Sequence, residues 1–388
     1  MTHSRTIDPQ SVPLLDIVGN NRPLHDEILS AIRDVFETGA FLHGPAVSEL
    51  ENSVAELVGS KHAIGCASGS DALLLALMAL NIGAGDEVIV PSFTFFATAS
   101  AVDRLGAKIV FVDIEPDTFN LDPAKVKAAI TPHTKAIIPV HLFGRCANMT
   151  ELQQISDEAG IRVIEDAAQA IGSDHAGCGA GAWGDVGCFS FYPTKNLGGC
   201  GDGGMLTTSD DNLAERLRLF AAHGMKPRYV HRVVGIASRL DTIQAAALCV
   251  KLKHLERWTE SRRQNAVRYF NLFADSGLDG QIALPADDTN GKHIWNQYTI
   301  RVPSARRDAL RSHLAEQRIA SEIYYPIPLH QQECFRHVAV APGSLLESER
   351  AAAEVLSLPI FPDLTLGEQQ RVVEGIASYF AARKVSAA

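Results

Sequence analysis

The chain has 388 residues, a length that suits two domains sharing an interface. Its 35 Lys and Arg residues against 45 Asp and Glu give a net charge of −10, which argues against non-specific nucleic-acid binding because such binding needs a basic surface. The longest apolar run, Ala72–Leu80, is too short for a membrane span, and the polar Met1–Gln10 lacks the hydrophobic stretch of a signal peptide. The seven scattered cysteines form no Cys-x-x-Cys pair, so we expect a reduced, cytoplasmic, globular enzyme.

Short β-rich runs alternate with helical stretches between residues 61 and 208. We expect strands at His62–Cys66, Glu87–Val90, Lys108–Val112, Lys135–His141, Ile161–Glu165, Val186–Phe191 and Gly204–Thr207. Helices are expected at Asp71–Leu80, Phe95–Leu105, Pro123–Ile130 and Met149–Ala159. This alternation predicts a doubly wound, mostly parallel α/β sheet, in which ligands bind at the carboxyl ends of the strands.

The pattern changes after Arg239. A single long helix is expected over Asp241–Asp275, because apolar residues recur there at spacings of three and four. It is followed by an expected strand at Trp295–Val302, a helix at Ala305–Gln317, a strand at Ser321–Tyr325 and two late helices. We therefore divide the chain inside the long helix, into a large domain of residues 13–255 and a smaller α+β domain of residues 256–388.

Three stretches carry candidate chemistry. The first is "CASGSDALL", where a strand ends and a buried helix begins after a turn of small residues. Free N–H groups at such a helix start can bind a phosphate. A plain helix cap by Ser70 or Asp71 is the alternative interpretation.

The second stretch is "VIEDAAQA", in which Asp166 falls at the carboxyl end of a buried strand. A buried carboxylate needs a partner that offsets its desolvation. That partner is either structural, such as a helix N-terminus or an arginine, or the protonated ring nitrogen of a cofactor. Glu165 points to the opposite face of the strand, so the two residues do not form an acid–base pair.

The third stretch is "FSFYPTKNLGGCGDGG", which places Lys195 in a loop just past another strand. Most loop lysines are solvated, but a lysine drawn into the interior has a lowered pKa and can act as a nucleophile or form a Schiff base. Gly199, Gly201 and Gly204 also fit the dinucleotide pattern Gly-x-Gly-x-x-Gly. They lead into a strand and open no helix, so binding of NAD here is rejected.

Other chemistries lack support in the sequence. The fourteen histidines show no His-x-x-x-His helix motif, and Cys178, Cys188 and Cys200 lack the spacing of metal ligands, so no metal site is expected. A Gly-x-Ser-x-Gly elbow is also missing, which leaves an α/β-hydrolase unsupported.

Seven motifs occur in order over nearly the whole chain: "PSFTFFATA", "PVHLFG", "VIEDAAQAIG", "FSFYPTKNLGGCGDGG", "RLDTIQAA", "WNQYTIRV" and "IYYPIPLHQQ". With them the sequence resembles the DegT-type nucleotide-sugar aminotransferases, which depend on pyridoxal 5′-phosphate. The resemblance implies the aspartate-aminotransferase fold (fold type I), with a large domain around a mostly parallel seven-stranded sheet and a smaller α+β C-terminal domain.

The resemblance also implies roles for individual residues. Lys195 matches the lysine that forms a Schiff base with the cofactor and shuttles the proton, and Asp166 matches the carboxylate that keeps the pyridine nitrogen protonated. The other cofactor-binding matches are Gly69 and Ser70 in the phosphate turn, Ser190 as a further phosphate contact, Phe95 as the residue stacked on the ring, and Gln169 beside the phenolate oxygen. The matches near the sugar pocket are Arg239, His293, Tyr325 and His330.

One position departs from the family pattern. The family commonly reads Gly-x-Asn-x-Arg-Leu, in which the Asn reaches the cofactor phosphate of the neighbouring subunit. Here Ala237 stands in place of that Asn, and Ser238 or a water molecule is left to make the contact. The resemblance thus implies a homodimer with sites at its interface, and Ala237 implies weaker cofactor binding.

The expected function is amino transfer to a keto-sugar carried on a nucleotide diphosphate, with glutamate as the donor, in a pathway that makes amino sugars. Within the resembled family "PVHLFG" is more typical of enzymes that act at carbon 3, so a 3-keto sugar is favoured over a 4-keto sugar. One alternative is a pyridoxamine-phosphate-dependent sugar dehydratase, in which histidine replaces the lysine. Another is a non-catalytic regulatory relative, which predicts loss of Lys195 or Asp166, and both are present.

Overall fold

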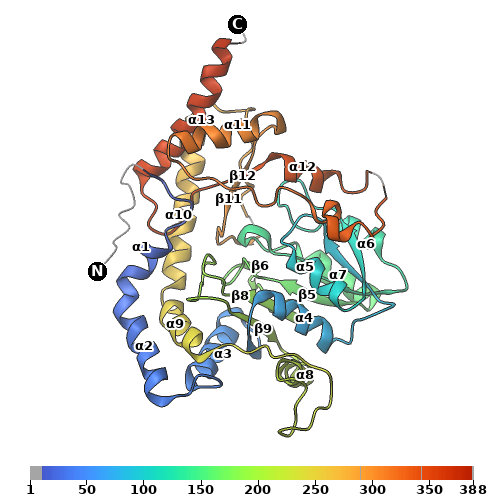
Figure 1. The fold of residues 1–388 in the computed structure, drawn as a ribbon. Helices are drawn as coiled ribbons and strands as arrows, with labels where there is room; N and C mark the ends of the chain where they lie inside the picture. The colour runs from blue at the N-terminus through green and yellow to red at the C-terminus, as the bar shows by residue number, and fades with distance from the viewer. Residues whose placement is uncertain (1–10, 289, 342, 387–388) are drawn as a thin grey trace.

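Figure 1 shows the chain as a computed structural model, which describes residues 11–288, 290–341 and 343–386. Residues 1–10, on which the expectation of no signal peptide depends, lie outside this range. Helices α1 (Ile17–Asn21), α2 (His25–Thr38) and α3 (Pro45–Val58) precede the central sheet. No helix in the described ranges is both long enough and apolar enough to cross a membrane.

A seven-stranded sheet forms the centre of the molecule. Its strands are β1 (His62–Cys66), β2 (Glu87–Pro91), β3 (Lys108–Val112), β4 (Thr134–Ile137), β5 (Arg162–Asp166), β8 (Val186–Ser190) and β9 (Gly204–Thr208). They lie in the order β1-β9-β8-β5-β4-β2-β3. Strand β9 runs in the direction opposite to the other six strands of this sheet, so the prediction of a mostly parallel seven-stranded sheet is confirmed.

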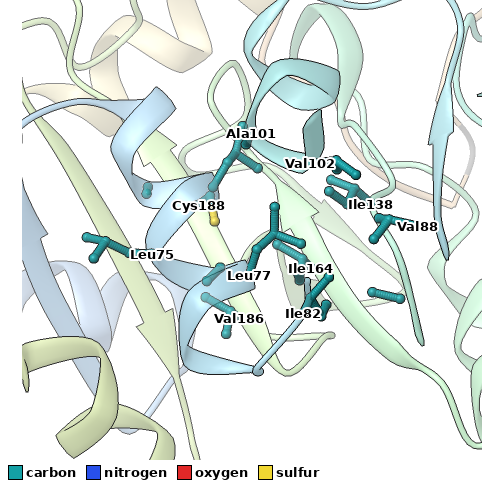
Figure 2. Close-up of a cluster of buried hydrophobic side chains, with 14 of the residues drawn as sticks. Leu75, Leu77, Ile82, Val88, Ala101, Val102, Ile138, Ile164, Val186 and Cys188 are labelled. Atoms are coloured by element: carbon teal, nitrogen blue, oxygen red, sulfur yellow. The ribbon is translucent and has the colours of Figure 1, made fainter. Parts of the chain in front are cut away.

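Helices cover both faces of this sheet because residues of each strand alternate between two cores. Val88 and Val90 of β2 pack with α4 (Gly69–Ala79), α5 (Ala97–Arg104) and α8 (Asp211–Ala221). Figure 2 shows part of this core, which includes Leu75 and Leu77 of α4 and Val186 and Cys188 of β8. On the opposite face the strands pack against α3, α6 (Pro123–Ala129), α7 (Met149–Ala159) and α9 (Thr242–Leu252).

The C-terminal part has a separate core. This core is formed by α10 (Leu255–Ala274), the strand pair β11 (Tyr298–Arg301) and β12 (Val355–Leu358), and the helices α11 (Ser304–Glu316) and α13 (Leu366–Ser386). Helix α12 (Leu346–Glu354) instead packs its buried Ala351 and Ala352 with Phe93 and Phe143 of the large domain. In Figure 1 the yellow α10 runs from α9 toward these elements. A small sheet of β6 (Asp174–His175), β7 (Cys178–Gly179) and β10 (Gly291–Lys292) completes the fold.

Two predicted elements are wrong. The expected single helix over Asp241–Asp275 is broken at Lys253 and His254, between α9 and α10. The expected strand at Ser321–Tyr325 is absent from the described structure, where Glu322 forms only an isolated bridge to Ser357. Pro326 follows at once, and this proline favours an extended segment over continuation of a ladder.

The strand expected at Trp295–Val302 is shorter than predicted, because β11 begins only at Tyr298. The backbone N–H groups of Ile294 and Asn296 donate to the carbonyl oxygens of Gly144 and Phe143 instead of to a neighbouring strand. Trp295 between them has a φ of 51°, which interrupts the extended conformation.

Candidate active site

A cavity of about 620 Å³ opens at the carboxyl ends of the parallel strands. Eight of the residues singled out from the sequence line it, namely Gly69, Ser70, Phe95, Asp166, Gln169, Ser190, Lys195 and Tyr325. They come from the ends of four strands, β1, β2, β5 and β8, with the turns that follow them, and from the segment between α11 and α12. The fold therefore brings together residues that lie up to 256 positions apart (325 − 69).

Asp166 ends β5 and is almost fully buried. Its Oδ2 accepts a hydrogen bond from the Thr98 hydroxyl at 2.7 Å, and its Oδ1 accepts one from the N–H of Ala168 at 3.2 Å. Burial raises the pKa of Asp166, while these two bonds and the nearby Lys195 act in the opposite direction. A cation placed against this carboxylate would offset the cost of its burial.

Lys195 lies in the loop after β8 and faces the same cavity. Burial lowers the pKa of its amine to about 8, with Asp166 acting in the opposite direction. At pH 7 about a tenth of this amine is therefore neutral, far more than for an ordinary lysine, and this neutral form can act as a nucleophile and base.

The loop that carries Lys195 is held from several sides. The backbone N–H of Lys195 donates to the carbonyl of Tyr192 at 2.9 Å, and Asn196 Nδ2 donates to the carbonyl of Ile294 at 3.0 Å. From α9, Gln244 accepts from the N–H of Cys200 at 2.8 Å and Lys251 donates to the carbonyl of Gly198. These contacts fix the backbone of the loop from which the Lys195 side chain extends into the cavity.

The start of α4 has the geometry of an anion site. The cap is Ser68, whose side chain accepts from the N–H of Asp71, so the predicted alternative of a cap by Ser70 or Asp71 is wrong. A Cβ on Gly69 would lie 2.7 Å from Cβ of Ser190, so only glycine allows this close approach. Ser190 Oγ accepts from the N–H of Tyr192 at 3.3 Å, which leaves the hydroxyl proton free to be donated to a ligand.

Aromatic rings and an amide line the rest of the cavity wall. Gln169 Oε1 accepts from the N–H of Phe143 at 2.7 Å, and its Nε2 donates to the hydroxyl of Tyr325 at 3.2 Å. The ring of Tyr325 lies 6.1 Å from the ring of Phe95, centroid to centroid. Phe95 is 55% exposed, so its ring is open to a ligand.

The other three sequence-predicted residues do not line this cavity. His293 is buried, with its ring stacked on Trp295 at 3.9 Å, and burial lowers its pKa to about 3, so it is neutral. His330 is held by Ser92 and Glu349. Arg239 is half-buried in the segment after α8.

Ser238 does not replace the expected asparagine from a neighbouring chain. Its side chain is fully buried, and its Oγ accepts from the N–H of Ala67 in the same chain at 3.1 Å. Ala237 beside it is exposed.

The cavity also contains residues that sequence reasoning missed, namely Tyr192, Thr194, Asp202, Gln297 and Tyr324. Thr98, the partner of Asp166, was missed as well, although it lies within "PSFTFFATA". All six of these residues lie within the seven motifs, but the position of a residue in a motif does not show whether its side chain points into the cavity. In the described ranges, His, Cys, Asp and Glu do not gather in any group of three or more that could hold a metal.

This fold, with a cavity at the strand ends that contains a buried carboxylate and a lysine of lowered pKa, is that of the fold type I aminotransferases. The chain belongs to the DegT/DnrJ/EryC1/StrS aminotransferase family, whose sequence profile matches residues 23–377.

Known proteins similar to the chain carry both enzymatic and regulatory names. It is 49% identical to a "pleiotropic regulatory protein" of Geobacillus stearothermophilus, over 95% of this chain and 99% of that one. It is 47% identical to a UDP-N-acetyl-3-dehydro-α-D-glucosamine 3-aminotransferase of Acidithiobacillus ferrooxidans, over 91% of this chain and 94% of that one. Among solved structures, NtdA of Bacillus subtilis with bound cofactor PMP has a TM-score of 0.88 at 33% identity, over 96% of this chain and 86% of that one.

Proposed function

We propose that the protein is a pyridoxal-phosphate-dependent aminotransferase that moves an amino group from glutamate to carbon 3 of a keto-sugar linked to a nucleotide diphosphate. The observation that carries the proposal is that Lys195, Asp166 and the start of α4 face one cavity. The cofactor has an aldehyde, a basic ring nitrogen and a phosphate, and these three features fit the three groups. Phe95 would stack on the face of its ring, and Gln169 would lie beside its phenolate oxygen.

Pyridoxal phosphate, when bound, supplies an electron-withdrawing ring that stabilises negative charge on the carbon next to the transferred amine. Asp166 would hold the proton on the ring nitrogen. The N–H groups at the start of α4 and the Ser190 hydroxyl would bind the phosphate. Lys195 would act as the base that moves the proton of the reacting carbon, and an amine with a pKa of about 8 is well matched to that role.

A sugar substrate is favoured by the relatives and by the cavity. The relative from Acidithiobacillus ferrooxidans is named for amino transfer at carbon 3 of a UDP-linked sugar. Val140 and Leu142 of "PVHLFG", the motif associated with carbon 3, both line the cavity. The volume of about 620 Å³ leaves room for a sugar beside a cofactor.

The proposal is tested with a panel of UDP- and dTDP-linked 3-keto and 4-keto sugars, each assayed with glutamate. We expect the 3-keto sugars to be aminated with a kcat/KM at least about 10-fold higher than the 4-keto sugars, since one misplaced reacting group costs about 1–3 kcal/mol. The measurement is the formation of 2-oxoglutarate together with the mass of the sugar product. Equal or preferred use of 4-keto sugars would contradict the assignment to carbon 3.

Two rival functions fit the residues less well. A sugar dehydratase of this fold has histidine in place of the lysine, and the chain keeps Lys195. A purely regulatory protein, as the name of the Geobacillus relative suggests, needs neither a lysine of lowered pKa nor a buried carboxylate in a cavity. Catalysis accounts for both.

A cytoplasmic location is part of the proposal, because all seven cysteines are free.

We also propose that the active unit is a homodimer. Among the described residues that line the cavity, Lys195 is the only Lys or Arg, and it faces two carboxylates, Asp166 and Asp202. A diphosphate therefore needs cations from another chain, and residues 223–239 carry Lys226, Arg228, His231, Arg232 and Arg239. Large exposed apolar side chains suit such a contact and include Leu29, Phe36, Phe41, Tyr229 and Val234.

Ala237→Asn tests whether this segment reaches the neighbour's cofactor phosphate. We expect the substitution to keep the dimer and to tighten binding of pyridoxal phosphate roughly 2- to 10-fold, the value of one added hydrogen bond of about 0.5–1.5 kcal/mol. The dissociation constant is measured by titrating the cofactor into the protein freed of it. Ala237→Leu, which matches Asn in shape without its amide, is the control and should bring no gain. A fully active monomer in sedimentation would contradict a site built at the interface.

A further inference from the structure

His330 joins the end of β2 to the C-terminal part of the chain. Its Nδ1 lies 2.6 Å from the hydroxyl of Ser92, the residue directly after β2, and its Nε2 lies 3.2 Å from Oε1 of Glu349. The carbonyl of Ser92 also accepts from the N–H of Leu329 at 2.7 Å. Ser92 is fully buried and the His330 side chain is only 8% exposed. Both ring nitrogens are therefore engaged within the protein and are not available to a sugar.

The helix that carries Glu349 is itself fixed to the end of the neighbouring strand. Asp113, directly after β3, accepts from the N–H of Ser348 at 2.7 Å, from its hydroxyl at 2.6 Å and from the N–H of Glu347 at 3.0 Å. These contacts hold the start of α12 against the large sheet. Two adjacent strand ends thus anchor the same C-terminal region.

The anchored segment leads directly into the cavity. Tyr325 lies five residues before His330, and Pro326 and Pro328 between them restrict the backbone. The Tyr325 hydroxyl accepts from Gln169, and its ring lies 6.1 Å from the ring of Phe93. Because the connection is short and stiff, release of its His330 end would shift Tyr325.

We propose that Ser92, His330 and Glu349 are positioning residues that hold Tyr325 in place to contact the sugar, and that His330 does not contact the sugar itself. The proposal rests on the proposed function in that it takes the cavity as the sugar site. The ring is held on both sides, with the Ser92 hydroxyl at Nδ1 and the Glu349 carboxylate at Nε2.

The first test is hydrogen–deuterium exchange without substrate, on wild type, Ser92→Ala, His330→Ala and the double variant. We expect amides of residues 323–329 to exchange at least about 10-fold faster in each single variant, since a buried partner is lost. The double variant should exchange no faster than the faster single one, because both remove the same contact. Unchanged exchange in Ser92→Ala would overturn the proposal.

The matched control is His337→Ala. His337 also bonds the large domain, through Asp103 at 3.0 Å, and bonds the carbonyl of Cys334 at 3.0 Å, but it lies on the exposed surface. Its removal should leave exchange at 323–329 unchanged. Equal acceleration in this control would mean that any loosening of the C-terminal region has the same effect, and would overturn the specific role of His330.

Kinetics give the second test. In Ser92→Ala and His330→Ala we expect KM for the keto-sugar to rise about 5- to 50-fold while kcat changes less than about threefold. His330→Asn keeps an amide that can pair with Ser92 and should recover most of the affinity. A rise in KM for His330→Ala with none for Ser92→Ala would place His330 on the sugar and overturn the proposal. If no sugar is aminated at all, the proposed function fails, while the exchange test still decides the role of Ser92 and His330.

Discussion

Lys195→Ala is expected to abolish amino transfer while leaving the fold intact. The substitution removes the amine that attaches to the cofactor and the base that moves the proton, and proton transfer alone contributes about 10²–10⁴-fold. We therefore expect kcat to fall by at least about 10⁴-fold, measured as 2-oxoglutarate formed from glutamate. Lys195 occupies a loop anchored by Gln244 and Lys251, so loss of its side chain should not disturb that loop.

The control for this variant is Lys253→Ala. Lys253 is an exposed lysine at the break between α9 and α10, and its ion pair with Glu27 lies on the surface. It should keep full activity. Residual turnover in Lys195→Ala above about one hundredth of the wild-type rate would assign the proton transfer to another group.

Asp166→Asn is expected to keep cofactor binding but to slow amino transfer by about 10²–10³-fold, as for loss of one preorganised charge at a reacting centre. An amide cannot hold the ring nitrogen protonated, so the negative charge formed on proton removal is less stabilised. The Asn oxygen can replace Oδ1 and accept from the Ala168 N–H, while the amide nitrogen in place of Oδ2 can donate to the Thr98 hydroxyl oxygen, which keeps the side chain in place. Stopped-flow single turnovers with glutamate measure the slowed step separately from cofactor loss.

Glu165→Gln is the matched control for the charge at β5. Glu165 is the residue before Asp166 and is fully buried on the other face, where its carboxylate accepts from the N–H groups of Gly181, Trp183 and Gly184 and lies 2.8 Å from His141 Nε2. Its loss of charge is expected to lower stability more than the rate of amino transfer. If Asp166→Asn turned over at nearly the wild-type rate, the carboxylate would have a different role.

The sequence predicted the large domain well because buried parallel strands have a strong local signature. Runs such as Glu87–Val90 and Lys108–Val112 can bury their hydrophobic side chains on both faces only between two layers of helices. The break at His254 left no such signature, since Leu252 and Leu255 continue the apolar spacing across it. Leu252 and Leu255 both pack on the large-domain core, whereas Tyr269 and Phe273, later in α10, belong to the C-terminal core.

The sequence also predicted those residues of the candidate site that lie at the ends of strands. Asp166 ends a strand and Lys195 follows one, so topology alone brings them to one edge of the sheet. Thr98 reaches Asp166 from a helix 68 residues earlier in the chain, and that contact depends on how α5 packs. The ring of His293 stacks on Trp295, and the ring of His330 bonds Ser92. Neither side chain lines the cavity, although Gln297 and Tyr325, a few residues away, do.

The most direct test of the account is to load the purified protein with pyridoxal phosphate, reduce it with borohydride, and locate the label by mass spectrometry of its peptides. The account predicts a yellow protein that loses its colour on reduction and carries the cofactor on Lys195. A protein that takes up no cofactor, or a label on any other lysine, would contradict it.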